Sequence, residues 1–568
     1  MPANDSPPLP GAAKNSFWER VPLYPFFLAV YPVLFLAAHN GVPLDRIVLF
    51  PLILSAAITL LLFGLLNCAV GSIRKTGAVV ALWVVLFFWS YPLFDVLKKG
   101  TVIWIGSDAI LLFFLLYPIG TIWLLRRRSD YRLATRMLNT MTLVLLVLVA
   151  LSAVGNQFVT AGKAQRADKS ENTEVPSPTP KSPVEAETNS RSGAVSTTTR
   201  AATAPDVFVI LLDAYVGQEC MQEVYGFDNG EFLDYLREKK FSLAKRSTSN
   251  YPATMFSLPF FFAMDYHDEN YSREFHDEFG RGNDVVVAKR TLSGRAIRRF
   301  LANGYRSIFI SPAYLCGKEK AAGIEIHGAD TGGDPEFSAI LWGSTLLRYF
   351  GPPPGVAEGY RKHTVKTFEL IEAAARERLQ PGKQSAPCFV FAYVSCPHSP
   401  FVFRRDGSAL PRHWEGLLSN ALKKEYCVEQ HEYVNRRVKE IIDLLTADPD
   451  RLPIIVVFSD HSARTVAGSV AIRNTSREGI LDTFSNLVAV HVPEGKTDLL
   501  PDGLSNVNVM RVLFNHLDGT NEPLMPDKYY SLREGRCREV TDIVVSALAN
   551  PPENTKATTS GRNPADGP

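Results

Sequence analysis

The sequence predicts an N-terminal region of about five transmembrane helices, followed by an α/β domain with a mainly parallel sheet sandwiched by helices. The first 155 residues are far richer in apolar side chains than the rest of the 568-residue chain. Between residues 205 and 548, short apolar runs alternate with helical patterns, which is typical of a parallel sheet covered on both faces. Three of these runs stop at a polar residue, and ligands of such sheets bind at the carboxyl ends of strands.

Five apolar segments within residues 1–160 are long enough to cross a hydrocarbon core of roughly 30 Å. They lack the polar faces that buried helices of a soluble protein would show. A cleaved signal peptide would not be followed by four further apolar runs. The expected spans are 22–40, 46–70, 76–97, 102–125 and 134–154.

Basic residues in the short loops between these spans indicate the orientation, because such residues favour the cytoplasm. The run at 126–132, with Arg136 just beyond it, is the strongest cluster, and the pair at 74–75 shares its side if there are five spans. The lysines at 98–99 favour the opposite orientation. The majority places the N-terminus in the cytoplasm, so five spans send everything after residue 155 to the outside.

The rest of the chain divides into a flexible linker at 161–204, a domain at 205–548 and a disordered tail at 549–568. The linker and tail are rich in Ser, Thr, Pro and charge and could not build a core. With 60 basic against 58 acidic residues, the chain is nearly neutral and indicates no nucleic-acid partner. The expected strands of the domain are 206–212, 306–311, 388–394, 454–459 and 487–492.

Cysteine usage leaves two interpretations open. The chain has seven cysteines, of which Cys68 falls within an expected span. The even number in the exterior domain permits disulfides in an oxidising compartment, although the sequence does not choose their pairing. For Cys388, which opens an apolar strand, a free buried thiol is an equal alternative. The six residues are Cys220, Cys316, Cys388, Cys396, Cys427 and Cys537.

Acidic and imidazole side chains follow two of the expected strands. Asp213 ends the run DVFVILLD, and it would either cap the next helix or bind a ligand there. Asp460 and His461 directly follow the run IIVVFS. An adjacent carboxylate and imidazole can reach one cation if the backbone turns sharply, so this pair favours a metal site over a surface histidine.

Two loops supply the remaining candidates. In SNYPATMFSLP, Pro252 disfavours helix before it, so a helix beginning near Ala253 would place Thr254 in its first turn. The unpaired amides of that turn favour an anionic oxygen or a phosphate, although a threonine cap is an equal alternative. His398 stands between two prolines that fix its loop, where it could bond a leaving oxygen or a phosphate. The polar groups that compete with Thr254 are Ser249, Asn250 and Ser257.

Taken together, these motifs resemble those of membrane-anchored sulfatase-like proteins of the alkaline-phosphatase superfamily. This branch includes lipoteichoic acid synthases and the phosphoethanolamine or phosphoglycerol transferases of bacterial envelopes. TMFSLP at 254–259 is similar to the nucleophile segment of the phosphoethanolamine transferases, and SNYPAT at 249–254 to that of bacterial sulfatase-like proteins. FSDH at 458–461 resembles the metal-binding strand end, and PHSPFVF at 397–403 the substrate-side histidine loop.

The resemblance implies one divalent cation, Mn²⁺, Zn²⁺ or Mg²⁺, held by Asp213, Thr254, Asp460 and His461. Thr254 would also be the nucleophile, activated by the cation and carrying a phospho-threonine intermediate. His398 would contact the phosphate or assist the leaving group. The expected substrate contacts are Asn250, Tyr251, Arg464 and Asn474.

Several departures from the family pattern limit which members of the superfamily the chain resembles. The envelope transferases usually have Glu where this chain has Asp213, and family members commonly have Gly where Ser462 follows the Asp-His pair. No second-metal Asp-x-x-x-His segment is present, which argues against a two-zinc phosphatase. No Cys-x-Pro-x-Arg segment is present, which argues against a formylglycine sulfatase. The cysteines that flank the nucleophile in phosphoethanolamine transferases are replaced by Asn250 and Phe260.

The resemblance implies a multi-pass protein of a bacterial inner (plasma) membrane, with its catalytic domain on the periplasmic or extracellular side. The expected activity moves a phosphoglycerol or phosphoethanolamine group from a phospholipid donor to an envelope glycan or lipid acceptor. The alternative is a phosphodiesterase, phosphatase or sulfuric ester hydrolase that uses water as acceptor. A third hypothesis is a non-catalytic membrane protein that keeps a decayed fold.

Overall fold

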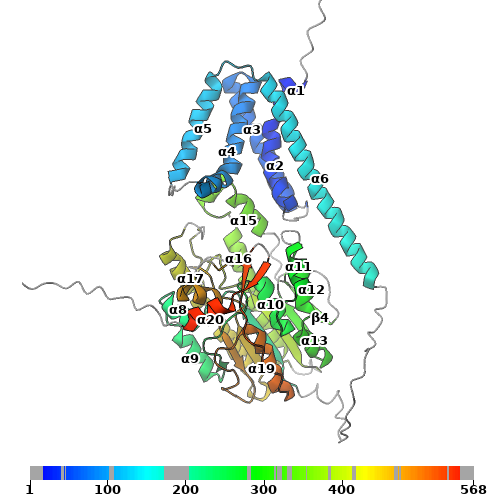
Figure 1. Ribbon diagram of the computed structural model, residues 1–568, viewed down its shortest axis with the longest axis vertical. Helices are drawn as coiled ribbons and strands as arrows, with labels where there is room; N and C mark the ends of the chain where they lie inside the picture. The colour runs from blue at the N-terminus through cyan, green and yellow to red at the C-terminus, as the bar shows by residue number, and fades with distance from the viewer. Residues whose placement is uncertain are drawn as a thin grey trace, which may run out of the picture.

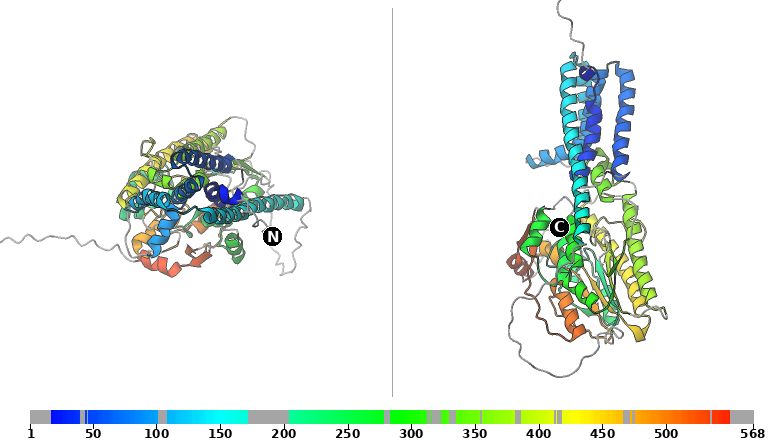
Figure 2. Two further views of the ribbon diagram at one scale, coloured as in Figure 1. Left: turned by 90° about the horizontal axis from the view of Figure 1, so that it is seen from above. Right: turned by 90° about the vertical axis from the view of Figure 1, so that its right-hand side faces the viewer.

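The computed structural model contains a bundle of long helices and an α/β domain (Figure 1). Figure 2 shows the bundle standing on one end of the domain in a second view. The structure describes residues 17–39, 44, 46–100, 108–171, 204–277, 283–311, 315, 323–328, 335–353, 355–380, 386–411, 413, 418–465, 471–472, 475–533 and 536–549.

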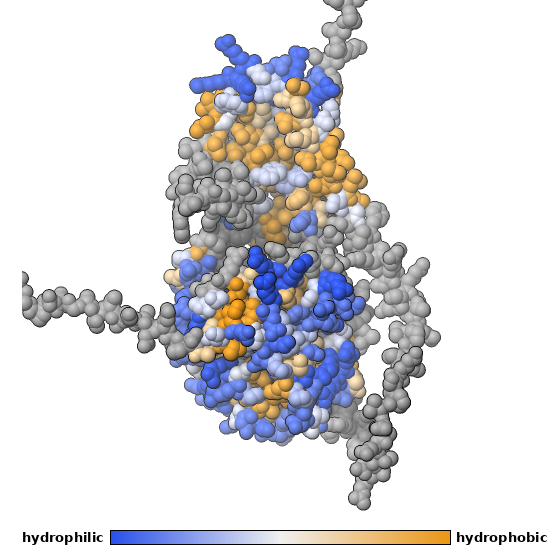
Figure 3. Space-filling model, in the orientation of Figure 1, coloured by the Kyte–Doolittle hydropathy of each residue, from blue (hydrophilic) through white to orange (hydrophobic). Residues whose placement is uncertain are grey.

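The bundle is built from apolar helices whose outer surfaces carry hydrophobic side chains (Figure 3). Among the described residues, Arg46–Val70 and Arg132–Ser152 are long and apolar enough to cross a membrane, judged by length and composition. The five-span arrangement therefore stays a prediction. The helices are α1 (Phe17–Arg20), α2 (Tyr24–His39), α3 (Arg46–Val70), α4 (Ile73–Gly100), α5 (Asp108–Arg126) and α6 (Arg132–Glu171).

Helix α6 continues to Glu171, so it includes the first part of the segment 161–204 that was expected to be a linker. This part of the helix contains Ala, Lys, Gln and Arg, which are good helix formers and so extend it. Residues 172–203 of the expected linker and 550–568 of the expected tail lie outside the described residues. The domain boundaries stay predictions.

Helix α1 and the α5–α6 connection lie at the end of the bundle that is farther from the α/β domain (Figure 1), and hydrophilic residues gather at that end (Figure 3). A guanidinium nitrogen of Arg74, near the start of α4, donates to the carbonyl of Asp130, between α5 and α6, at 2.9 Å. Arg136 pairs with Glu19 of α1 at 3.2 Å. These contacts hold the α3–α4 connection, the α5–α6 connection and α1 together at one end of the bundle.

A seven-stranded mixed sheet forms the centre of the α/β domain, in the order β2-β7-β6-β1-β5-β3-β4. The pairings β1–β5, β1–β6, β3–β5 and β3–β4 are parallel, and those of β7 with β6 and β2 are antiparallel. The predicted strands are confirmed to within a residue at each end, and the two short edge strands β2 and β4 are additions. The strands are β1 (Val207–Leu212), β2 (Ser242–Leu243), β3 (Arg306–Ile310), β4 (Ile324–His327), β5 (Cys388–Val394), β6 (Ile454–Phe458) and β7 (Val488–His491).

Helices cover both faces of this sheet, as predicted. Successive side chains of a strand point to opposite faces, so Val207, Val209 and Leu211 of β1 join one core and the residues between them join the other. Helices α10 (Thr254–Ala263), α12 (Asn283–Leu292), α13 (Arg295–Ala302) and α19 (Asn506–Asp518) pack on the first face. Helices α9 (Gly230–Glu238), α16 (Val356–Glu377) and α17 (Asn420–Leu445) pack on the second.

Helix α17 shows how the apolar pattern sets this packing. Its residues Val434, Val438, Ile441, Ile442 and Leu445 recur at helical spacing and are all buried, as the sequence predicts. The remaining elements are α8 (Gln218–Glu223), α11 (Glu269–Asp277), α15 (Pro335–Gly343), η1 (Leu346–Phe350), η3 (Pro449–Arg451), α18 (Arg477–Phe484), α20 (Thr541–Ala549) and the hairpin β8 (Tyr530–Arg533) and β9 (Arg536–Glu539).

The cysteines in the described part of the chain are thiols. Cys388 is buried, which agrees with the second alternative, and Cys220, Cys396 and Cys427 are buried as well. Cys316 lies outside the described residues. Burial raises the pKa of the Cys220 and Cys396 thiols well above its usual range, which disfavours a reactive thiolate at either position.

We expect His431 of α17 to make the stability of the domain pH-dependent. Its Nε2 accepts the backbone N–H of Val216 at 3.0 Å, and burial lowers the pKa of the imidazole to about 4. The unfolded chain binds the proton at about pH 6.5. The stabilisation should therefore be complete above pH 6.5 and fall by up to about 3 kcal/mol as the pH drops towards 4.

His431→Gln keeps an acceptor for Val216 but cannot bind the proton, so its urea-unfolding midpoint should change less between pH 7.5 and 4.5. His327→Gln, on an exposed strand end, is the matched control and should behave like the wild type. An unchanged pH profile in His431→Gln would contradict this role.

Candidate metal centre

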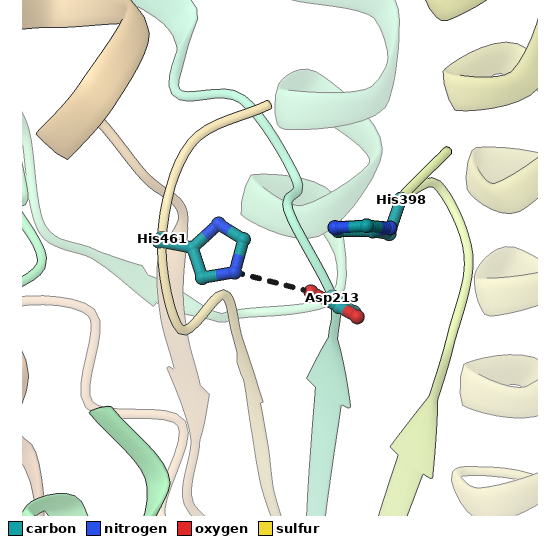
Figure 4. A group of neighbouring side chains, drawn as sticks. All are labelled: Asp213, His398 and His461. Atoms are coloured by element: carbon teal, nitrogen blue, oxygen red, sulfur yellow. Dashed lines mark ion pairs between the residues drawn. The ribbon is translucent and has the colours of Figure 1, made fainter. Parts of the chain in front are cut away.

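Three neighbouring strands deliver the candidate residues to one edge of the sheet (Figure 4). Asp213 follows β1, His398 lies in the loop after β5, and Asp460 and His461 follow β6. These strands are parallel, so their carboxyl ends lie at the same edge. Ligand atoms of Asp213, His398 and His461 all lie within 4.8 Å of one another.

Asp460 is fully buried, and its two oxygens have different surroundings. Oδ1 accepts the backbone N–H of Ala214 at 3.2 Å and that of His461 at 3.0 Å. Oδ2 is buried without a hydrogen-bond donor among the described residues. Ala214 adopts a left-handed conformation, with a φ of 61°, as the chain turns after β1 and presents its N–H to Asp460.

His461 is held as the tautomer that suits a metal ligand. Its Nδ1 lies 2.8 Å from the carbonyl oxygen of Ser462, which can only accept, so Nδ1 carries the proton and donates it. The lone pair of Nε2 therefore points towards the carboxylates. Nε2 lies 3.4 Å from Oδ2 of Asp460 and 3.4 Å from Oδ1 of Asp213. At metal sites, a hydrogen bond from the other ring nitrogen of a histidine ligand fixes the orientation of the ring.

Asp213 repeats the pattern of Asp460. Oδ2 accepts the hydroxyl of Tyr393, the last residue but one of β5. Oδ1 is buried without a hydrogen-bond donor among the residues that the structure describes. The backbone N–H of Asp213 donates to the carbonyl of Val394 at 2.9 Å, which continues the β1–β5 pairing up to the site.

Thr254 is the first residue of α10, and its side chain is only partly buried. The hydroxyl Oγ1 lies 3.4 Å from Nε2 of His461. A hydroxyl in this position faces both the ligand atoms and the unpaired amides of a helix N-terminus, where negative charge is stabilised.

A divalent cation fits this arrangement. The buried oxygens of Asp213 and Asp460 and the nitrogen of His461 direct lone pairs at one another, which is unfavourable unless a positive charge lies between them. Four ligands of zinc bonded at 2.0–2.1 Å in a tetrahedron are separated by about 3.3–3.4 Å. The separations of 3.4 Å between Nε2 and its three oxygen neighbours match that spacing.

The electrostatics of the two carboxylates agree with this fit. Burial raises the pKa of Asp213 to about 7, although the Tyr393 hydroxyl and the charge of Arg464 act in the opposite direction. Burial and the neighbouring Asp213 raise the pKa of Asp460 to about 7, while the nearby Thr254 hydroxyl and the backbone N–H of Ala214 act in the opposite direction. Burial lowers the pKa of His461 well below its usual range, so the ring is neutral. A bound cation would stabilise both carboxylates in their charged form.

The His398 loop is held by a residue of α17. The buried Gln430 donates to the carbonyls of Pro397 and His398 at 3.1 and 3.0 Å and accepts the backbone N–H of Val402 at 2.7 Å. Nδ1 of His398 lies 2.6 Å from the carbonyl of Ser399, and its ring centre lies 6.0 Å from that of His461. The partly exposed imidazole therefore stands at the open side of the ligand cluster.

The residues expected to contact the substrate have different surroundings. Arg464 is close enough to lower the pKa of Asp213, so its charge acts on the site. Asn250 accepts the N–H of Val507 and donates to the carbonyl of Lys528, and the ring of Tyr251 is buried. Both residues thus brace the loop before Thr254, and we propose a supporting role for them in place of substrate contact. Asn474 lies outside the described residues.

Several supporting residues were missed in the sequence. Tyr393 looks like one more large residue of a buried strand, and only its register beside Leu211 places its hydroxyl at the site. Asn486 and Asn506 each donate to the carbonyl of Ser459, at 2.8 and 2.9 Å, and so fix the backbone before Asp460. Gln430 lies far along the chain from the loop that it holds. None of these residues stands in a recognisable motif.

The chain is similar to several solved structures. No family model and no curated protein matches the chain. The C-terminal periplasmic domain of EptC from Escherichia coli, in a complex with zinc, is a similar structure with 12% identity and a TM-score of 0.35, covering 59% of this chain and 93% of that one. A protein in the alkaline phosphatase superfamily from Vibrio parahaemolyticus has 12% identity and a TM-score of 0.35, with coverages of 59% and 75%.

An integral membrane protein is also among the similar structures. The integral membrane protein lipooligosaccharide phosphoethanolamine transferase A from Neisseria meningitidis has 12% identity and a TM-score of 0.33, covering 88% of this chain and 96% of that one. Phosphoethanolamine transferases and alkaline-phosphatase-superfamily proteins are thus among the structures that the chain resembles. At these identities and scores, the proposals below rest on the side-chain geometry and the sheet topology.

We expect Tyr393→Phe to weaken metal binding without unfolding the domain. The variant loses only the hydroxyl that orients Asp213. Loss of a hydrogen bond to a metal ligand typically reduces metal affinity about 10–100-fold. Asp460→Asn, which alters a ligand, should reduce the affinity further. Competition with a chromophoric zinc chelator measures both effects.

Tyr305→Phe is the matched control, because its hydroxyl donates to the carbonyl of Pro205, before the start of β1 and so at the opposite edge of the sheet. Its metal affinity should equal that of the wild type. Equal affinity in Tyr393→Phe and Tyr305→Phe would remove Tyr393 from the support of the site.

Proposed function

We propose that this protein is a metal-dependent transferase of the cell envelope with Thr254 as its nucleophile. It moves a phosphoglycerol or phosphoethanolamine group from a phospholipid to an envelope glycan or lipid. The observation that carries the proposal is the position of the Thr254 hydroxyl, 3.4 Å from Nε2 of His461 and beside two buried carboxylates. A hydroxyl is a weak nucleophile and needs such a setting to attack phosphorus.

One divalent cation would be held by Asp213, Asp460, His461 and the Thr254 oxygen. When bound, it lowers the pKa of the hydroxyl and neutralises charge on the phosphoryl oxygens. The ligand set has one nitrogen that lies 3.4 Å from each of three oxygens. A nitrogen ligand favours zinc over magnesium, because magnesium prefers an octahedral shell of oxygens.

The first half-reaction forms a bond between Oγ1 of Thr254 and phosphorus and breaks the bond from phosphorus to the lipid glycerol oxygen. The hydroxyl proton leaves Thr254, and the Asp460 carboxylate accepts it, since Oδ2 of Asp460 and the Thr254 hydroxyl both lie 3.4 Å from Nε2 of His461. His398 stands at the open side of the cluster, where a protonated imidazole gives a proton to the departing diacylglycerol oxygen.

The second half-reaction transfers the group from phospho-threonine to the acceptor. A hydroxyl of the acceptor attacks phosphorus, His398 takes its proton, and Thr254 leaves with a proton returned from Asp460. Water in place of the acceptor gives a phosphodiesterase or phosphatase, and an ester of sulfate would follow the same path. The partly exposed Thr254 admits either acceptor, so product analysis separates transfer from hydrolysis.

The proposed location is a bacterial inner membrane, with five spans and the catalytic domain outside. Support comes from the bundle, because the basic residues near Arg74 and Arg136 gather at the end farther from the α/β domain. Such residues favour the cytoplasmic side of a membrane. The proposed donor would be reached from the outer surface of that membrane.

Thr254→Ala should abolish turnover of a nitrophenyl phosphodiester, with a fall of about 10³-fold or more, because the covalent intermediate cannot form. EDTA should remove wild-type activity, and zinc should restore it. Thr254→Ser should keep part of the activity. Mass spectrometry of the wild type quenched with phospholipid should find the transferred group on the peptide that contains Thr254.

The matched control is Ser257→Ala, one turn further along α10. The hydroxyl of Ser257 donates to the carbonyl of Tyr251 at 3.1 Å, so its loss should leave turnover within a few-fold of the wild type. Activity that survives in Thr254→Ala but not in Ser257→Ala would move the nucleophile to Ser257.

A reporter fused after Glu171 should be exterior, because five spans precede it. Alkaline phosphatase fused there should be active in cells, and green fluorescent protein dark. The same reporters fused after Arg127, between α5 and α6, should give the opposite result. Matching results at the two positions would contradict the five-span topology.

A further inference from the structure

Helix α15 and the adjoining turn η1 lie between the α/β domain and the bundle (Figure 1). We call Pro335–Phe350 the docking segment. Phe337 is 3% exposed and packs in one cluster with Val33 and Ala37 of α2 and Val48 of α3. Leu341, one turn further along α15, packs against the same cluster. Apolar side chains of the domain are thus buried by membrane helices.

The docking segment is braced within itself. The indole N–H of Trp342 donates to the carbonyl of Leu347 at 3.1 Å and to that of Gly351 at 2.8 Å. The hydroxyl of Thr345 caps η1 by accepting the N–H of Leu347. These bonds hold η1 against α15, and η1 in turn lies against α4.

The helix that follows shows which edge of the sheet the docking segment occupies. Near the start of α16, Arg361 donates to the carbonyl of Val402, in the segment that follows the His398 loop. Just past its end, Arg378 pairs with Asp206, which precedes β1 and accepts the N–H of Cys388 at the start of β5. Helix α16 therefore runs from the carboxyl edge of the sheet to the amino edge, and the docking segment before it lies at the carboxyl edge with the metal centre.

We propose that the docking segment holds the catalytic edge of the domain against the outer ends of α2 and α3, so that the site is presented to substrates within the membrane. The chain passes from the bundle to the domain once, after α6, and one covalent connection does not by itself set the orientation of a domain. The apolar contact of Phe337 supplies the orientation. Turnover of membrane substrates then depends on this contact, whereas turnover of soluble substrates does not.

The first test needs no activity. A protease site is inserted between residues 172 and 203 of the full chain, and the linker is cut in membranes. The wild-type domain should stay with the membrane after cutting, and Phe337→Glu should release it to the soluble fraction. The milder double variant Phe337→Ala with Leu341→Ala should release part of it, and Ile340→Ala, at a position 43% exposed on the same helix, should release none. Equal retention of the wild type and Phe337→Glu would overturn the proposal.

The second test rests on the proposed function. With the linker intact, Phe337→Glu should lower turnover of fluorescent phospholipid in vesicles about tenfold relative to turnover of a soluble nitrophenyl phosphodiester. An unchanged ratio would overturn the coupling. If the wild type turns over neither substrate, the proposed function fails, and the release experiment alone decides on the docking segment.

Discussion

The candidate site depends on the different partners of the two carboxylate oxygens of Asp460. Two backbone N–H groups hold Oδ1, so Oδ2 is left facing the unprotonated nitrogen of His461. One of those N–H groups belongs to Ala214, whose left-handed conformation also turns the chain after Asp213. A single carboxylate thus ties the ends of β1 and β6 together and leaves on Oδ2 a buried lone pair that a cation would satisfy. The other ligands converge because these strand ends are joined.

The sequence predicted the parts of this arrangement that are local in the chain. The runs at Val207–Leu212 and Ile454–Phe458 are apolar throughout, so they had to be buried strands, and the polar residue at the end of each had to lie at the sheet edge. Pro252 placed the start of α10 at the predicted turn, with Thr254 as its first residue. These expectations needed only strand length, residue type and the parallel arrangement of the strands.

The sequence could not predict the residues that orient the ligands, because their role arises from pairing between distant segments. Tyr393 bonds Asp213 across 180 residues, and Asn506 reaches the backbone of Ser459 across 47. Asn250 shows the same limit: an amide beside the predicted nucleophile suggests substrate binding, and the sequence does not reveal that it also bonds the backbone of residues 507 and 528. The hydrogen-bond partners of a polar side chain depend on its neighbours in the tertiary structure, and a single sequence does not reveal those neighbours.

The position of the docking segment follows from the sheet topology. Strands β1, β5 and β6 are parallel, so every carboxyl end, and hence the metal centre, lies at one edge. Helix α16 must return the chain to the amino edge before β5 can begin, so whatever precedes α16 has to lie at the carboxyl edge. The docking segment, which precedes α16, therefore lies at the same edge of the sheet as the candidate site. Phe337 is buried among residues of α2 and α3, so the same edge faces the bundle, and one topological constraint places both the candidate ligands and the docking segment.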